Sequence, residues 1–123
     1  MATPRKSRPH TNLSEAQLEA VARRFRALAV PSRLRALNAL MNGPLTMNQL
    51  VDATGLGQSN LSRQITELEL AGCVLRERNG REVTVHIADP TLQQLCELVC
   101  GSLVEQASVK HHQLRKAAGR NKP

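Results

Sequence analysis

The middle of the chain places a short predicted helix, a glycine turn, a longer predicted helix and a hairpin signal in direct succession. Thr46 and Gln49 have the spacing of a capping box, which predicts a helix that ends before the turn Gly55-Leu56-Gly57. A longer helix is expected over about residues 58–71, because leucine and isoleucine recur there at three- and four-residue steps. This succession is typical of a helix-turn-helix.

A β-hairpin is predicted immediately after the longer helix. Asn79-Gly80 favours a two-residue turn of type I′, in which both central residues need a positive φ. Apolar residues at 83, 85 and 87 alternate with polar ones, so the returning strand buries one face. A hairpin in this position is the wing of a winged helix-turn-helix.

Helices are also predicted on both sides of this motif. Ser14 begins one with a capping-box spacing, and Ser32 is expected to cap a second after Pro31. Asp89-Pro90 has the composition of a helix start, and a wide apolar stripe follows it. The predicted fold is therefore mostly α with a small β-hairpin, in the order α-α-α-α-β-β-α, and the apolar last helix is expected to be covered by a second copy in a homodimer.

The formal net charge of +7 lies in the two ends of the chain. Residues 1–13 carry three basic residues and residues 108–123 carry five, whereas residues 14–107 carry nine basic residues against ten acids. We interpret residues 1–13 as a disordered basic arm, 14–107 as one winged-helix DNA-binding and dimerisation domain, and 108–123 as a basic C-terminal extension. Since basic ends either bind phosphates or simply remain solvated, the case for DNA has to come from residues 14–107.

The first two turns of the longer helix are crowded with side chains that suit bases and phosphates. Gln and Asn bond bidentately to adenine and Arg to guanine, while Ser hydroxyls suit phosphate oxygens, and the start of this helix enters the major groove in such motifs. The candidate DNA-binding residues are Gln58, Ser59, Asn60, Ser62, Arg63 and Gln64, with Arg78 and Arg81 at the hairpin tip. The alternative is a solvated helix start beside a solvated hairpin tip.

Five short segments carry a family resemblance: FRALA at 25–29, PSRLR at 31–35, QSNLSRQ at 58–64, AG at 71–72 and GR at 80–81. Together they resemble the ArsR/SmtB family of winged-helix repressors. The resemblance implies a homodimer whose first and last helices form the interface, and repression of promoter DNA until a ligand or an oxidant acts. It also implies that the polar residues of 58–64 read bases, with Gln64 at a position where the family often has His.

Within this resemblance, the candidate residues for sensing an inducer are cysteines. One family site uses cysteines in the helix before the recognition helix, and residues 47–52 contain none. Another uses Asp and His at the start of the last helix, but here Asp89 is followed two residues later by Thr91. Cys96 and Cys100 remain, four residues apart on one helix face. They suit a soft ion or metalloid such as As(III), Cd(II) or Pb(II), although redox sensing and simple apolar packing are alternatives.

Cysteine usage and hydropathy exclude several classes. Cys73 is predicted to be a core residue, or a third thiolate if the fold brings it near the other two. Three cysteines and the lack of an apolar leader favour the cytoplasm, and no stretch is long and apolar enough to span a membrane. No nucleophile–base pair or phosphate-cradling loop occurs, so an enzyme is not expected.

We therefore expect a sequence-specific DNA-binding repressor that a thiophilic metal or metalloid releases from a near-palindromic promoter site. Two alternatives stay open. One is the same repressor with redox sensing or without cysteine-based sensing. The other is an architectural DNA binder that uses its basic ends, which would lack a large affinity gap between one site and random DNA at moderate salt.

Overall fold

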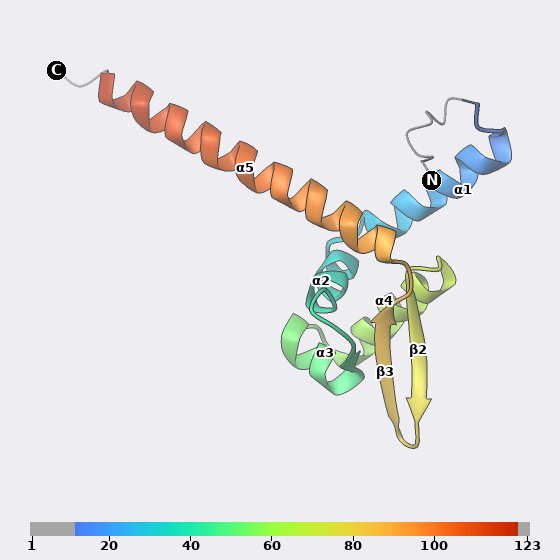
Figure 1. The fold of residues 1–123 in the computed structure, drawn as a ribbon. Helices are drawn as coiled ribbons and strands as arrows, with labels where there is room; N and C mark the ends of the chain where they lie inside the picture. Colours follow the sequence, from blue (N-terminus) through green and yellow to red (C-terminus); the bar gives the residue numbers. More distant parts are fainter. Residues whose placement is uncertain (1–11, 121–123) are drawn as a thin grey trace, which may run out of the picture.

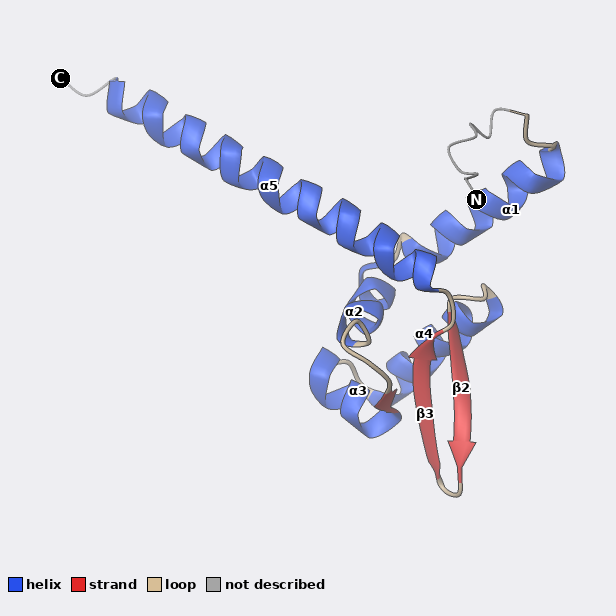
Figure 2. Cartoon of the chain, viewed as in Figure 1, coloured by secondary structure: helices blue, strands red, loops and turns tan. Residues whose placement is uncertain are grey.

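The computed structural model describes residues 12–120, which form five helices and a three-stranded antiparallel sheet (Figures 1 and 2). In chain order the elements are α1 (Glu15–Leu28), α2 (Pro31–Ala39), β1 (Leu45–Thr46), α3 (Met47–Thr54), α4 (Gln58–Leu70), β2 (Val74–Asn79), β3 (Glu82–Ile87) and α5 (Pro90–Arg120). The predicted winged helix-turn-helix order is confirmed, with β1 as an addition. The predicted basic arm at 1–13 lies outside the described residues, apart from its last two.

The helix starts follow from local hydrogen bonding. The predicted capping boxes at Ser14 and Thr46 are confirmed, since each hydroxyl accepts the backbone N–H three residues later at 3.1 Å. The predicted cap at Ser32 is wrong. α2 begins one residue earlier at Pro31, and its N-cap Val30 makes no side-chain bond. Proline suits the first helical position because its φ is preset and it has no amide to satisfy.

The core lies between α2, α3, α4 and the sheet. Its largest fully buried side chains are Leu37, Leu50, Leu61, Ile65, Leu68, Cys73, Val74 and Val85. The inward face predicted for the longer helix is confirmed, and so is the core position of Cys73. Burying each large aliphatic side chain contributes about 1.5–3 kcal/mol. This core fixes α4 against the sheet and leaves its other face to solvent.

β3 is the central strand, with β1 on one side and β2 on the other. The β2–β3 ladder pairs Val74 with Ile87 and Asn79 with Glu82, so the two-residue turn is Gly80-Arg81. The predicted type I′ turn at Asn79-Gly80 is wrong. Such a turn needs a positive φ at both residues, and Gly80 has one (66°) whereas Asn79 does not. Glycine at the first central position fits a type II′ turn. The hairpin projects beyond the helices as a wing (Figure 1).

Among the described residues, α5 contacts the rest of the protein through its first turns. Leu92 is buried, and the Gln93 side-chain amide donates to the carbonyl of Met41 at 2.8 Å. From Glu97 to Arg115 every side chain is exposed, and the helix extends away from the body (Figure 1). The basic extension expected at 108–123 continues this helix to Arg120. The composition of residues 117–123 (AAGRNKP), like that of the basic arm, predicts disorder, and this prediction is wrong for residues 117–120.

Candidate DNA-binding interface

A tight turn between α3 and α4 sets the position of the second helix. Gly55 ends α3 in the left-handed conformation (φ 73°), which costs glycine little. The Thr54 hydroxyl donates to the carbonyl of Leu50 at 2.7 Å and accepts from the amide of Leu56 at 3.2 Å. Gly57 precedes α4 and no side chain caps it, so the first amides of α4 have no side-chain acceptor. Such a helix start suits a phosphate oxygen.

The first two turns of α4 present a polar face to solvent. Gln58, Ser59 and Arg63 are exposed, and Ser62 is half-buried. Behind them, Leu61 and Ile65 are fully buried and hold the helix to the core. The arrangement therefore exposes most of the side chains that the sequence selected, on a helix that cannot rotate without losing core packing.

Gln64 does not belong to this exposed face. Its side chain is only 8% exposed, and its carbonyl oxygen accepts from Arg33 Nε at 2.9 Å. Its amide nitrogen donates to Asn60 Oδ1 at 3.0 Å. In the described chain this side chain is engaged within the protein, and contact of Gln64 with bases stays a prediction. Asn60 is half-buried and its oxygen is occupied, which leaves its amide NH2 as the free part.

The wing places its two predicted arginines differently. Arg78 and Arg81 are both exposed. Arg81 lies with Gln58 and Ser62 around a hollow of about 300 Å³ between α4 and the wing, whereas Arg78 does not line it. The structure thus brings Arg81, in the hairpin turn, beside the start of α4, whereas Arg78 lies on β2 opposite Val83 and outside this hollow.

Arg76 is a residue of this interface that the sequence reasoning missed. Its guanidinium donates to the carbonyl of Ser62 at 3.0 Å and to the hydroxyl of Thr66 at 2.7 Å, and its Nε lies 3.7 Å from a Glu69 oxygen. It therefore ties β2 to α4. The alternation along β2 carried a signal, because Arg76 shares the inward side of the strand with buried Val74.

The two candidate metal ligands meet at one hollow. Cys96 is half-buried and Cys100 is exposed, and both line a largely apolar hollow of about 670 Å³ between α2 and α5, with Met41 and Leu34 opposite. Burial raises the pKa of the Cys96 thiol, and the neighbouring Cys100 raises it further. The described part of one chain contains no cluster of three or more His, Cys, Asp or Glu side chains placed to hold a metal.

Cys73 differs from these two thiols in its burial. It is fully buried, and burial is the main cause that raises its thiol pKa, with smaller effects from charged neighbours and from Cys96. Unlike Cys96, Cys73 has no exposed surface through which an ion or an oxidant could reach its sulfur. The packing interpretation of Cys73 therefore stands, and the third-thiolate alternative loses support.

Comparisons with known proteins agree with this geometry. A MarR family model matches residues 31–82. The transcriptional regulator NmtR of Mycobacterium tuberculosis is 37% identical over 92 residues, which cover 75% of this chain and 77% of NmtR. The chain belongs to the ArsR/SmtB family. As a member of this family it is a winged helix-turn-helix transcriptional regulator and not an enzyme.

Solved structures place this ArsR/SmtB protein among DNA-binding domains. The homodimeric winged helix-turn-helix DNA-binding domain of Mb0332 from Mycobacterium bovis is 30% identical, with a TM-score of 0.68, and covers 83% of this chain and 95% of its own. The antimony-specific transcriptional repressor AntR is 28% identical, with a TM-score of 0.72, over 88% and 98% of the two chains. Within residues 12–120 no helix has the length and apolarity needed to cross a membrane.

Proposed function

We propose that this ArsR/SmtB protein is a homodimeric, sequence-specific DNA-binding repressor that a soft metal or metalloid releases from its promoter. The observation that carries the DNA part is the exposed polar start of α4, held rigid by buried Leu61 and Ile65 and flanked by the wing. In this motif the start of the second helix enters the major groove.

Each exposed side chain has a distinct role in the proposed complex. Arg63 reads guanine through its guanidinium fork, and Gln58 reads adenine. Ser59 and Ser62 bind phosphate oxygens together with the first amides of α4, which fixes the register without reading bases. Arg81 contacts the backbone beside α4, and Arg78 at the wing reaches the adjacent minor groove.

Pairing of two copies follows from the apolar faces that one chain leaves in solvent. Leu98, Leu103 and Val104 of α5 are exposed, as are Val21 and Phe25 of α1. A helix with such residues over its length needs a cover, and an isologous pairing of α1 and α5 supplies one. The homodimeric state of the Mb0332 domain supports this pairing. The two α4 helices then meet a near-palindromic site one helical turn apart.

Cys96 and Cys100 are the proposed sensor. Two thiols on one chain are too few to saturate a trigonal or tetrahedral soft ion, so the second copy supplies the remaining thiols near the two-fold axis. The hollow with Met41 is apolar and includes a thioether, which also favours a soft ion such as As(III), Cd(II) or Pb(II). The antimony specificity of AntR supports a metalloid ligand for this fold.

The test is a titration of the protein–operator complex with As(III), Cd(II), Pb(II), Zn(II) and peroxide, followed by fluorescence anisotropy. We expect the soft ions to release DNA and Cys96→Ser with Cys100→Ser to abolish release while DNA affinity stays unchanged. The control is His111→Ala, which changes an exposed side chain on α5, the helix that carries both cysteines. Cys73→Ser does not serve as a control because that thiol is part of the core. Release that persists in the double variant contradicts the sensor assignment, and release by peroxide alone favours redox sensing.

The pH dependence of release gives a second readout. Ion binding requires the thiolate, and the pKa of Cys96 is raised, so an ion that binds Cys96 at neutral pH displaces the proton of this thiol. Affinity for the soft ion is therefore expected to fall as the pH is lowered from 8 to 6. A pH-independent affinity contradicts thiolate coordination.

A further inference from the structure

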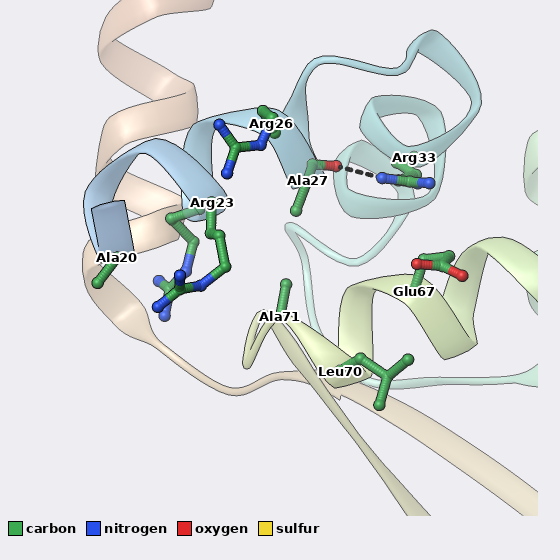
Figure 3. A pocket seen from close by; sticks show the side chains of 9 residues that line it. Ala20, Arg23, Arg26, Ala27, Arg33, Glu67, Leu70 and Ala71 are labelled. Carbon is green, nitrogen blue, oxygen red and sulfur yellow. Dashed lines mark hydrogen bonds between the residues drawn. The ribbon is translucent and has the colours of Figure 1, made fainter. Parts of the chain in front are cut away.

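A second hollow lies on α1, away from the DNA-binding face and from the cysteines. It has a volume of about 460 Å³ and is formed by α1, the start of α2 and the last turns of α4 (Figure 3). Sites for small ligands are commonly of this size. Its lining is unusual in charge, because it includes four arginines and one carboxylate: Arg23, Arg24, Arg26, Arg33 and Glu67.

Two of these arginines already have partners. Arg24 pairs with Asp89 at 3.3 Å, and Arg33 donates to Gln64 at 2.9 Å and to the carbonyl of Ala27 at 3.3 Å. The side chains of Arg23 and Arg26 form neither a hydrogen bond nor an ion pair with any described part of the chain. Figure 3 shows Arg23, Arg26, Arg33 and Glu67 among the side chains that line this hollow. Positive charge is thus concentrated there beyond what the protein itself neutralises.

The hollow is independent of the face that pairs two copies. On α1 the lining residues at 20, 23, 24 and 27 recur at three- and four-residue steps and so share one side of the helix. Leu18, Val21 and Phe25 recur in the same way on the other side. Covering the apolar side of α1 with a second copy therefore leaves Arg23 and Arg24 accessible, and Arg26 lies between the two sides of the helix. The hollow reaches Leu70, about 16 Å along α4 from Ser59, so it is also remote from the reading face.

We propose that this hollow binds a small oxyanion with two or more negative charges. Guanidinium groups bind phosphate and carboxylate oxygens through paired N–H donors, and Arg23 and Arg26 have these donors unused. Small side chains at Ala20, Ala27 and Ala71 leave room for the anion between the helices. Glu67 opposes binding and limits the hollow to ligands that carry more than one charge.

The experiment is calorimetric titration of the full-length protein, without DNA, with pyrophosphate and separately with citrate at constant ionic strength. Saturable binding with one site per chain is expected for at least one of them, and the tighter probe identifies the phosphate or carboxylate source. Arg23→Ala with Arg26→Ala is expected to weaken binding at least about tenfold, since two charge-assisted interactions are lost. Glu67→Gln is expected to tighten it about two- to fivefold.

The matched control is Lys110→Ala with Arg115→Ala, which removes the same charge from an exposed part of α5. This variant is expected to bind as the unaltered protein does. Binding that is absent for both probes overturns the proposal, and so does an equal loss in the control, which indicates general charge attraction. A changed molecular mass of the Arg23→Ala, Arg26→Ala variant with unchanged anion affinity also overturns it, because the arginines then contact the second copy.

Discussion

Arg63 is the side chain on which the proposed base readout depends most. It is exposed on the second turn of α4, and its only recorded contact in the described chain is with Asn60 Oδ1 at 3.4 Å, which leaves its fork available. Arg63→Ala is expected to cost about 1–3 kcal/mol of binding free energy and to relax preference at one base position. Anisotropy titrations against single-base operator variants measure this, with Arg115→Ala as the control. Unchanged affinity and base preference would remove Arg63 from the readout set.

Gln64 links two side chains of the protein through its amide group. Its amide joins Arg33 Nε to Asn60 Oδ1, and Gln64→Leu keeps the bulk of the side chain while it removes both of these hydrogen bonds. We expect the free energy of unfolding to fall by about 1–3 kcal/mol and operator affinity to fall with it. Urea unfolding measures the first. Gln58→Leu, an exposed change on the same helix, is expected to weaken DNA binding without lowering stability; equal stability of the two variants would contradict the network.

The sequence indicated where polar side chains gather on α4, but it did not indicate which of them faces the core. The exposure of Gln58, Ser59 and Arg63 could be predicted from their spacing at a helix start, and their contact with DNA stays a prediction. Gln64 directly follows Arg63 but lies on the buried side of α4, where Arg33 from α2 donates to its side-chain carbonyl. Arg33 is 31 positions away in sequence, and no local pattern predicts such a contact. Arg76 was missed for the same reason, since its acceptors lie on α4.

The start of α5 is an element whose stability depends on pH. The backbone N–H of Thr91 donates to Asp89 at 3.0 Å and holds the pKa of that carboxyl below its usual range, and Arg24 lowers it further. A depressed folded pKa contributes stability above the unfolded value of about 3.9, which is lost as the pH falls through the folded value. Unfolding curves from pH 6 to 2 are therefore expected to show a shallower acid limb in Asp89→Asn, and Arg24→Gln should shift it in the same direction. An unaltered limb in both would contradict this contribution.

Element order could be read from the sequence, whereas some element bounds could not. Capping boxes and glycine stops are local signals, so α1, α3 and α4 were predicted closely. β1 has two residues and exists only because it pairs with β3, as Leu45 does with Val85. The hairpin turn moved by one residue because the pairing of Asn79 with Glu82, rather than dipeptide preference, sets the register. Residues 108–120 are basic and were separated from the apolar segment before them, although the two form one continuous helix.

At the scale of the whole molecule, the proposal rests on two copies of the chain. The exposed side chains of α5 include Leu98, which is 72% exposed in one chain. Leu98→Glu with Leu103→Glu places charge on the proposed interface, and we expect it to halve the molecular mass in sedimentation equilibrium and to abolish specific DNA binding. Glu97→Gln is an exposed change on the same helix and serves as the control. A double variant that keeps both the mass and the affinity would show that α5 is not the pairing surface.

Hydroxyl-radical footprinting of the protein on a duplex selected from random sequences tests whether a dimer binds two successive major grooves. A dimer that lays two α4 helices into successive major grooves protects two inverted half-sites, with centres about 10–10.5 base pairs apart on one face of the duplex. That protection is the predicted result. A single unpaired protected segment, or protection that spreads evenly over unrelated sequences, would contradict it.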